Sequence, residues 1–507
     1  MHKILLPTIL ALALAATVRA EPALTIYNQD FAVVRDTVPL DLKAGPNDVR
    51  FTDTTTHLEP DSVILRDPAG KVRLRILEQN YRADPVSQGL LLSLFEGKTI
   101  DFLVTRPEGG KDEVVRGKII RSGYVPHSAA MRRYNDQYRY QQMALSNGSE
   151  GTGQPIVEVD GALRFSLPGQ PLFPALGDDT ILKPTLAWTI ESAAPAKLDA
   201  ELAYLTGGMT WDADYSVVAP EQGDRIDLTG LVTMDNQSGK TFTNARIKLM
   251  AGDVNKLDPN TGQVVMFATA RRSAALESSD PNAVTEKSFD EYHLYSLPRP
   301  TMLRDRETKQ VEFVRAEGVA SSRFYVYDGA KIDRSQSRNY SYENIRNDNN
   351  YGTQSNPKVW TMREFQNTES NGLGVPLPKG RVRFYRRDAD GQLEFTGENV
   401  IDHTPRDETL RVFTGAAFDL AGERKRTAYR VDDSRNWADE WFEVRLRNHK
   451  KETVEIRVVE HLYRWTNWEI ADNSDPFVKT EAQAVEFRVQ LKPDEEKVLH
   501  YKAHYSW

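Results

Sequence analysis

Apolar and polar residues alternate with a period of two over most of this chain, and this alternation is the feature that most constrains its fold. Residues two apart in an extended strand point to the same face, so the pattern buries one face and leaves the other in water. It is clearest near the two ends of the chain, in residues 33–51 and 485–507. Helical periodicity of useful length is found only in residues 127–145. The sequence therefore predicts an all-β protein with minor helix.

Three segments combine this alternation with turn residues and are predicted to be hairpins. Their turns are Gly45-Pro46, Asp390-Gly391 and Pro493-Asp494. Asp-Gly is a strong two-residue hairpin signal because both residues tolerate the backbone angles of such a turn. Each turn is flanked by strands whose apolar residues alternate, so one face of each hairpin is expected to be buried.

Two further segments resemble each other and point to repeated domains. Residues 231–250 and 443–462 each contain a strand, an asparagine (Asn236 or Asn448), a short polar turn and a second strand. That spacing is common in immunoglobulin-like sandwiches. We therefore predict several antiparallel β-sandwich domains and a small barrel-like N-terminal part. The predicted organisation is a signal peptide (1–20), an N-terminal β domain (21–125), a helical insertion and linker (126–155), a central sandwich (156–330), a polar loop (331–358) and a C-terminal sandwich (359–507).

The absence of cysteine narrows the possible chemistry. None of the 507 residues is cysteine, which excludes disulfides, cysteine nucleophiles and thiolate metal sites. A chain of this size can be stable by core burial alone, as several domains. With 65 basic and 73 acidic residues the net charge is −8. A surface of that sign argues against nucleic acid and anionic lipid headgroups as partners.

The first twenty residues are typical of a secretory signal peptide. Lys3 precedes an apolar run over residues 4–16, and the small residues Val18 and Ala20 follow. This pattern predicts export, with cleavage after Ala20, to the periplasm or the extracellular space. The alternative is a membrane anchor, but the run is shorter than the roughly 20 residues that a span needs. Nothing after Glu21 is predicted to be a transmembrane helix.

Several segments of the chain resemble the uncharacterised C-terminal domain of bacterial mucoidy-inhibitor-type exported proteins. The similarity is carried by residues 204–218, 236–254, 292–311, 376–408 and 446–462, and residues 25–51 are similar to the opening strands of the same proteins. The resemblance implies an exported β-rich domain with no agreed activity. Longer relatives have a coiled coil between their halves, and no sustained heptads occur here. Phe242 stands where the family has a tryptophan.

The motif Trp211-Asp212-Ala213-Asp214-Tyr215 has two interpretations. Asp212 and Asp214 share one face of a strand and are the candidates for a metal or sugar site. Alternatively Trp211, Ala213 and Tyr215 face a core, with both acids in water, after a turn or bulge at the preceding glycines. We favour the second interpretation, a corner in a β-sheet, and predict no metal and no cofactor.

The segment 401–408 supplies the candidates for catalysis, Asp402, His403, Asp407 and Glu408. Carboxylates beside a histidine can act as a general acid and base. The alternative is a turn built by Thr404-Pro405 before the next strand. Segment 401–408 alone does not define a catalytic site, because no catalytic partner for it can be identified elsewhere in the sequence. We therefore predict no catalytic residues.

These observations favour a non-catalytic binding or structural protein of the bacterial cell envelope. Two alternatives stay open: a carboxylate-based hydrolase acting on envelope polysaccharide, and a protein associated with the outer membrane. The partner is unknown, and an envelope protein or a polysaccharide is the kind expected. Aromatic residues stack on sugar rings when exposed and fill cores when buried. The candidates for such stacking are Trp360, Trp437, Trp441, Tyr463, Trp465 and Trp468.

Overall fold

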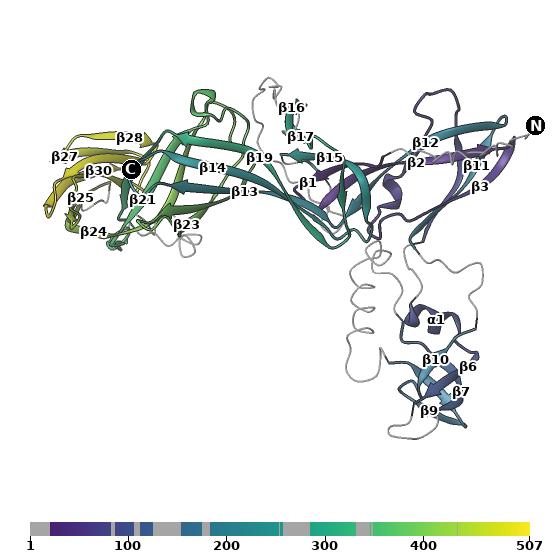
Figure 1. The fold of residues 1–507 in the computed structure, drawn as a ribbon. Coiled ribbons are helices and arrows are strands. Elements are labelled where there is room, and N and C mark those ends of the chain that lie inside the picture. The colour runs from purple at the N-terminus through teal and green to yellow at the C-terminus, as the bar shows by residue number, and fades with distance from the viewer. Residues whose placement is uncertain are drawn as a thin grey trace, which may run out of the picture. The chain divides into compact units, whose positions relative to one another are not determined.

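The structure, a computed structural model, describes most of the chain after residue 20. The described residues are 21–82, 87–105, 112–124, 154–174, 183–252, 254–256, 284–330, 345, 348–432, 434 and 436–507. The predicted signal peptide and the predicted helix at 127–145 lie outside them, as do most of the predicted linker and polar loop. Among the described residues the regular structure is nearly all strand, which confirms the all-β prediction (Figure 1).

Two compact units make up the chain. One comprises Met1–Trp211 and Met234–Lys309, and the other Asp212–Thr233 and Gln310–Trp507. Each unit is defined by residues that contact one another more than they contact the rest of the chain. The domain boundaries expected at residues 125, 155, 330 and 358 stay predictions.

The first unit contains three sheets. The largest has eight strands, in the order β16 (Thr285–Phe289), β17 (Tyr292–Ser296), β15 (Phe242–Ala251), β1 (Ala23–Tyr27), β2 (Phe31–Leu42), β12 (Ala196–Gly207) and β4 (Ile64–Arg66), with β18 (Thr301–Leu303) beside β15. A second has the order β3 (Gly45–Thr52), β11 (Thr185–Ser192) and β5 (Arg75–Arg82). The turn η1 (Pro60–Ser62) precedes β4.

A small five-stranded sheet completes this unit. Its order is β10 (Gln170–Leu172), β6 (Thr99–Val104), β7 (Glu113–Arg121), β8 (Ile156–Val159) and β9 (Ala162–Arg164). The short helix α1 (Gln88–Leu94) precedes it, and Leu92 of α1 shares a core with Phe102, Ile119 and Val157 of the sheet. The sheet is open, with β10 and β9 at its edges, where a barrel-like part was expected.

Two further sheets belong mainly to the second unit. One has the order β19 (Glu307–Val319), β14 (Ile226–Asn236), β13 (Met209–Ala219), β22 (Gly380–Arg387) and β23 (Leu393–Ile401). The other has nine strands: β27 (Trp468–Asn473), β30 (Glu496–Ser506), β25 (Trp437–Asn448), β24 (Thr409–Val431), β21 (Lys358–Gln366), β20 (Ser321–Asp328), β26 (Val454–His461), β29 (Ala484–Leu491) and β28 (Phe477–Glu481). The turn η2 (Glu369–Asn371) follows β21.

Only one of the three predicted hairpins is a hairpin. β22 and β23 pair in antiparallel fashion across the Asp390-Gly391 turn, and Gly391 has the positive φ of 83° that this turn requires. By contrast, Gly45-Pro46 is a bend in one long strand. β2 and β3 belong to different sheets. β2 pairs with β12, starting with Phe31 opposite Gly207, and β3 pairs with β11, ending with Thr52 opposite Thr185. The prediction of a hairpin there was wrong, because β2 already has β1 and β12 on its two sides.

The Pro493-Asp494 turn also fails to form a hairpin. β29 pairs with β26 and β28, whereas β30 pairs with β25 and β27. The turn is an arch that carries the chain from one half of the nine-stranded sheet to the other. Phe487 of β29 and Tyr501 of β30 meet in the same core, with ring centroids 5.7 Å apart. Alternation is preserved in an arch as in a hairpin, because both bury one face of each strand.

Buried asparagines hold two further arches, at the positions where the sequence echoes itself. Asn236, between β14 and β15, donates from Nδ2 to the carbonyls of Lys240 and Arg304, 2.9 Å from each. Asn448, between β25 and β26, donates in the same way to Glu452 and Lys492, again at 2.9 Å. In each arch the asparagine Oδ1 accepts from the backbone N–H two residues later. The repeated asparagine therefore marks a repeated structural device.

We expect Asn448→Ala to lower the free energy of unfolding by about 1–3 kcal/mol, because it removes a buried donor from the carbonyls of Glu452, Leu491 and Lys492, of which the Leu491 carbonyl is buried. Urea denaturation followed by tryptophan fluorescence measures the change. Asn473→Ala is the matched control: Asn473 is exposed and donates to the Asp475 carbonyl in an exposed hydrogen bond, so its loss is expected to stay within about 0.5 kcal/mol. Equal losses in the two variants would contradict the role given to the buried asparagine.

Candidate functional site

A small pocket with a volume of about 10 Å³, partly open to solvent, lies in the second unit. We call it the C-terminal pocket. Its wall includes Arg424 of β24, Glu440 of β25 and His461 at the end of β26, followed by Tyr463 and Arg464. The backbone around Tyr351 and Gly352 completes it. Three neighbouring or facing strands thus bring charged side chains together from residues far apart in sequence.

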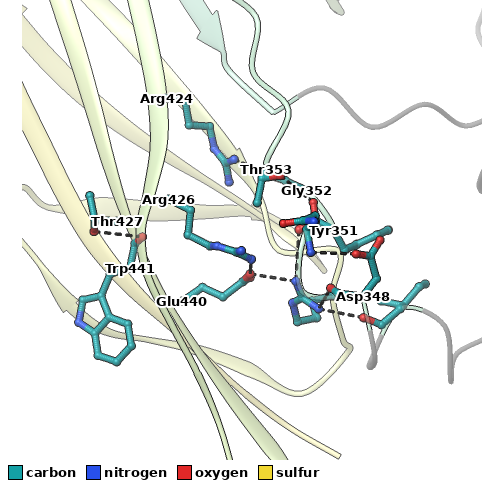
Figure 2. Close-up of polar contacts among 12 residues, drawn as sticks. Asp348, Tyr351, Gly352, Thr353, Arg424, Arg426, Thr427, Glu440 and Trp441 are labelled. Atoms are coloured by element: carbon teal, nitrogen blue, oxygen red, sulfur yellow. Dashed lines mark hydrogen bonds and ion pairs between the residues drawn. The ribbon is translucent and has the colours of Figure 1, made fainter.

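Two arginines share one carboxylate at this pocket. Arg426 Nη1 and Arg464 Nη2 donate to the same oxygen of Glu440, Oε1, at 2.9 and 3.0 Å (Figure 2). The side chains of Arg464 and Glu440 are only 1% and 4% exposed. Burial by itself would lower the pKa of Arg464, but the Glu440 carboxylate raises it above its ordinary value, so this arginine stays charged.

Arg464 and Arg424 hold a backbone segment against the sheet. Arg464 Nη1 donates to the carbonyls of Ile345 (2.8 Å) and Asp348 (3.1 Å), and Nη2 donates to that of Tyr351 (3.2 Å). Arg424 Nη1 donates to the Gly352 carbonyl at 2.7 Å (Figure 2). Guanidinium groups suit this task because they carry five donors in a fixed plane. The wall around Tyr351 is therefore fixed by side chains of the sheet.

A second buried ion pair lies beside the first. Arg424 Nε donates to both oxygens of Glu460, at 2.8 and 3.1 Å, and the Tyr501 hydroxyl donates to Glu460 Oε2 at 2.5 Å. The Arg424 and Glu460 side chains are 3% and 0% exposed. Burial, reinforced by the Glu460 charge, raises the pKa of Tyr501 well above its ordinary value, so the hydroxyl remains a donor.

His461 forms the remaining polar part of the wall. Its Nε2 lies 3.0 Å from Asp328 Oδ2 on β20, and its ring stacks on Tyr463 with centroids 4.8 Å apart. Burial would lower the pKa of His461, but the hydrogen bond and charge of Asp328 outweigh it and raise the pKa above the ordinary value. The histidine is therefore protonated over a wider pH range than a free imidazole.

The predicted sheet corner at residues 203–218 matches the structure. Gly208, with a φ of 74°, joins β12 of the eight-stranded sheet to β13 of another sheet. Trp211, Ala213 and Tyr215 are buried on one face, as expected. Asp212 is exposed, whereas Asp214 is half-buried and accepts from Thr233 and Arg383. Asp214 therefore has a structural role in its strand that the sequence did not indicate.

The four candidates for catalysis lie on the exposed connection between β23 and β24. The backbone N–H of Lys379 donates to His403 Nδ1 at 3.1 Å, and Asp407 pairs with Arg406. Asp402, His403, Asp407 and Glu408 are all exposed. The buried Asn367 holds this connection in place, because its Nδ2 donates to the Pro405 carbonyl at 2.9 Å. This arrangement fits the turn interpretation, and the C-terminal pocket is lined by other residues.

The aromatic candidates are distributed among separate contacts. Tyr463 lines the C-terminal pocket. Trp465 packs on Trp507, and Trp437 lies beside His504. The others have cations or rings as neighbours: Lys502 lies over Trp441, Lys479 over Trp468, and Phe413 beside Trp360.

The charged residues of the pocket were missed in the sequence, although a signal for them exists. Alternation places Glu440 on the same strand face as the buried Phe442 and Val444. It likewise places Glu460 on the same face as the buried Ile456 and Val458. A carboxylate at a core-facing position of a strand needs a buried partner. The partner's identity and the carbonyls that Arg464 binds depend on the fold.

Comparisons with known proteins leave the family open. No family model, no curated protein and no solved structure matches the chain. Among the described residues, no helix has the length and hydropathy of a membrane span. Within the same residues no group of three or more His, Asp or Glu side chains is arranged to hold a metal ion.

Proposed function

We propose that this chain is an exported, non-catalytic binding protein of the bacterial cell envelope, and that the C-terminal pocket holds its ligand. The observation that carries the proposal is a solvent-accessible pocket whose wall contains almost fully buried charged side chains. Well-packed apolar residues would stabilise a sheet as well as buried ion pairs do, or better. Polar groups that converge on a pocket are the usual means of fixing and selecting a ligand.

The way these groups are bound supports binding over catalysis. Arg424 and Arg464 each donate to a glutamate and to backbone carbonyls, so they are held rigidly. A general acid or base needs a proton that it can exchange with a substrate. In this wall the glutamates are tied to arginines, and rigid, pre-paired donors favour recognition. The signal sequence and the resemblance to exported envelope proteins support the location.

The test is retention of a small molecule by the purified chain. The chain is incubated with a small-molecule extract of bacterial envelopes, filtered and denatured, and the released compounds are measured by mass spectrometry. We expect a compound retained in near-equal amount to the protein and released unchanged. Ala330→Phe is the matched variant, because Ala330 lines the pocket without taking part in its ion pairs, and a larger side chain there fills the space. It is expected to retain none.

Two outcomes would contradict the proposal. One is a set of retained compounds that is the same for both proteins, since the pocket would then play no part. The other is a compound that is converted during incubation by the wild-type chain and left intact by Ala330→Phe, which would make the pocket an active site.

A further inference from the structure

We propose that residues 348–353, which we call the strap, open away from the sheet and thereby let a small molecule reach the C-terminal pocket. This inference rests on the proposed function, because it states how a ligand enters the pocket. As the structure shows it, the pocket has a volume of about 10 Å³, which is room for about one water molecule. A ligand therefore needs part of the wall to move.

The strap is built from turns and belongs to no strand. Some of its amide groups bond within the strap: the N–H of Tyr351 donates to the Asp348 carbonyl at 3.3 Å, and that of Thr353 donates to the Asn350 carbonyl at 3.2 Å. Segments without strand pairing open at a lower free-energy cost than the core strands of the same protein. The strap is therefore the part of the wall that can move while the strands stay in place.

Two arginines of the wall hold the strap closed (Figure 2). Arg464 donates to the carbonyls of Asp348 at 3.1 Å and Tyr351 at 3.2 Å. Arg424 donates to the Gly352 carbonyl at 2.7 Å. The ion pairs that these arginines form with glutamates of β25 and β26 do not involve the strap, so they persist when it opens.

Hydration makes the strap less costly to open than an apolar wall. With the strap closed, the side chains of Arg464 and Glu440 are almost completely buried, and Arg464 Nε has no hydrogen-bond partner among the described residues. An ion pair loses hydration when it is buried and regains it when water arrives. A buried polar atom without a partner also carries a free-energy cost that water removes. Both gains offset part of the loss of the bonds between guanidinium groups and carbonyls.

The experiment measures how fast phenylglyoxal, a small reagent for arginine, modifies individual arginines of the purified full chain. Peptide mass spectrometry at low conversion gives an initial rate for each of them. Two arginines outside the pocket set the scale, because the side chain of Arg306 is 84% exposed and that of Arg363 in β21 is 6% exposed.

We expect Arg464 to react more slowly than Arg306 but roughly tenfold or more faster than Arg363. The reagent reaches Arg464 whenever the strap opens, whereas it reaches Arg363 only when the sheet itself opens. Because phenylglyoxal is itself a small molecule, its access to Arg464 also shows that the opened wall admits one.

Gly352→Ala loosens the strap without changing the sheet. Gly352 has a φ of 72°, which alanine adopts only with strain, and a Cβ there meets no atom within 4 Å. The closed strap alone is strained, so we expect Arg464 to be modified roughly tenfold faster in this variant. Gly391→Ala is the matched control, because Gly391 has a φ of 83° and equally open surroundings in the turn between β22 and β23. It is expected to leave the rate at Arg464 unchanged.

Two results would overturn the inference: an Arg464 rate no higher than that of Arg363 in the wild-type chain, or an Arg464 rate that Gly352→Ala leaves unchanged. A failed strap is distinguishable from a failed function. If the extract experiment yields a compound that Ala330→Phe does not retain while Arg464 stays unreactive, the pocket holds its ligand without movement of the strap. If Arg464 reacts as expected and no retained compound depends on the pocket, the strap opens and the proposed function is wrong.

Discussion

Glu460→Ala is expected to lower the free energy of unfolding by about 3–5 kcal/mol, the range for removing one partner of a buried ion pair. The change leaves the Arg424 guanidinium charged and almost fully buried, with its Nε lacking an acceptor. It also removes the acceptor of the Tyr501 hydroxyl. Urea denaturation followed by tryptophan fluorescence measures the loss.

The control for this prediction is a solvent-exposed ion pair on the surface of the same sheet. Glu496 pairs with Arg445 at 3.0 Å, and their side chains are 43% and 40% exposed. Glu496→Ala is expected to cost no more than about 1 kcal/mol, because exposed pairs are screened. A double replacement, Arg424→Met with Glu460→Leu, should recover most of the lost stability, since apolar residues of similar size tolerate the site. If Glu460→Ala cost no more than Glu496→Ala, the buried pair would have no special role.

The faces of the strands were predictable from the sequence, whereas their partners were not. Alternation placed Val38, Leu40 and Leu42 on a buried face, and all three are buried. The turn residues predicted that the chain changes direction, yet only Asp390-Gly391 joins two strands that pair with each other. A hairpin and an arch bury the same alternate residues, so local sequence does not distinguish them. The choice depends on which distant strand occupies each edge.

The C-terminal pocket shows the same limit in its chemistry. Glu440 and Glu460 occupy core-facing positions of their strands, and their place in the alternating pattern is enough to indicate buried charges. The arginine partners come from β24 and from the residues after β26, and the carbonyls come from the segment around Tyr351. The two ion pairs join residues 36 and 24 positions apart, and the contact of Arg464 with the Tyr351 carbonyl joins residues 113 positions apart. Period and spacing carry no information about such pairs.

Trp211→Ala is expected to lower the free energy of unfolding by about 3–5 kcal/mol, the range for truncating a buried tryptophan. Trp211 is 1% exposed, and its ring lies 6.2 Å from that of Tyr295. Its Nε1 donates to the Met250 carbonyl at 3.1 Å, so the variant leaves a cavity and a buried carbonyl without its donor. Urea denaturation and thermal melting both measure the loss.

Substitutions of the neighbouring Asp212 and Asp214 distinguish a structural corner from a metal site. Asp212→Ala changes an exposed residue and is expected to alter stability by no more than about 0.5 kcal/mol. Asp214→Ala is expected to cost about 1 kcal/mol, because Asp214 accepts from Thr233 at 2.7 Å and from Arg383 at 3.2 Å. All three variants are melted with and without calcium. A calcium-dependent rise in melting temperature that Asp212→Ala abolishes would contradict the corner and make these carboxylates a metal site. If calcium has no effect and Trp211→Ala causes by far the largest loss, the stretch is a structural corner.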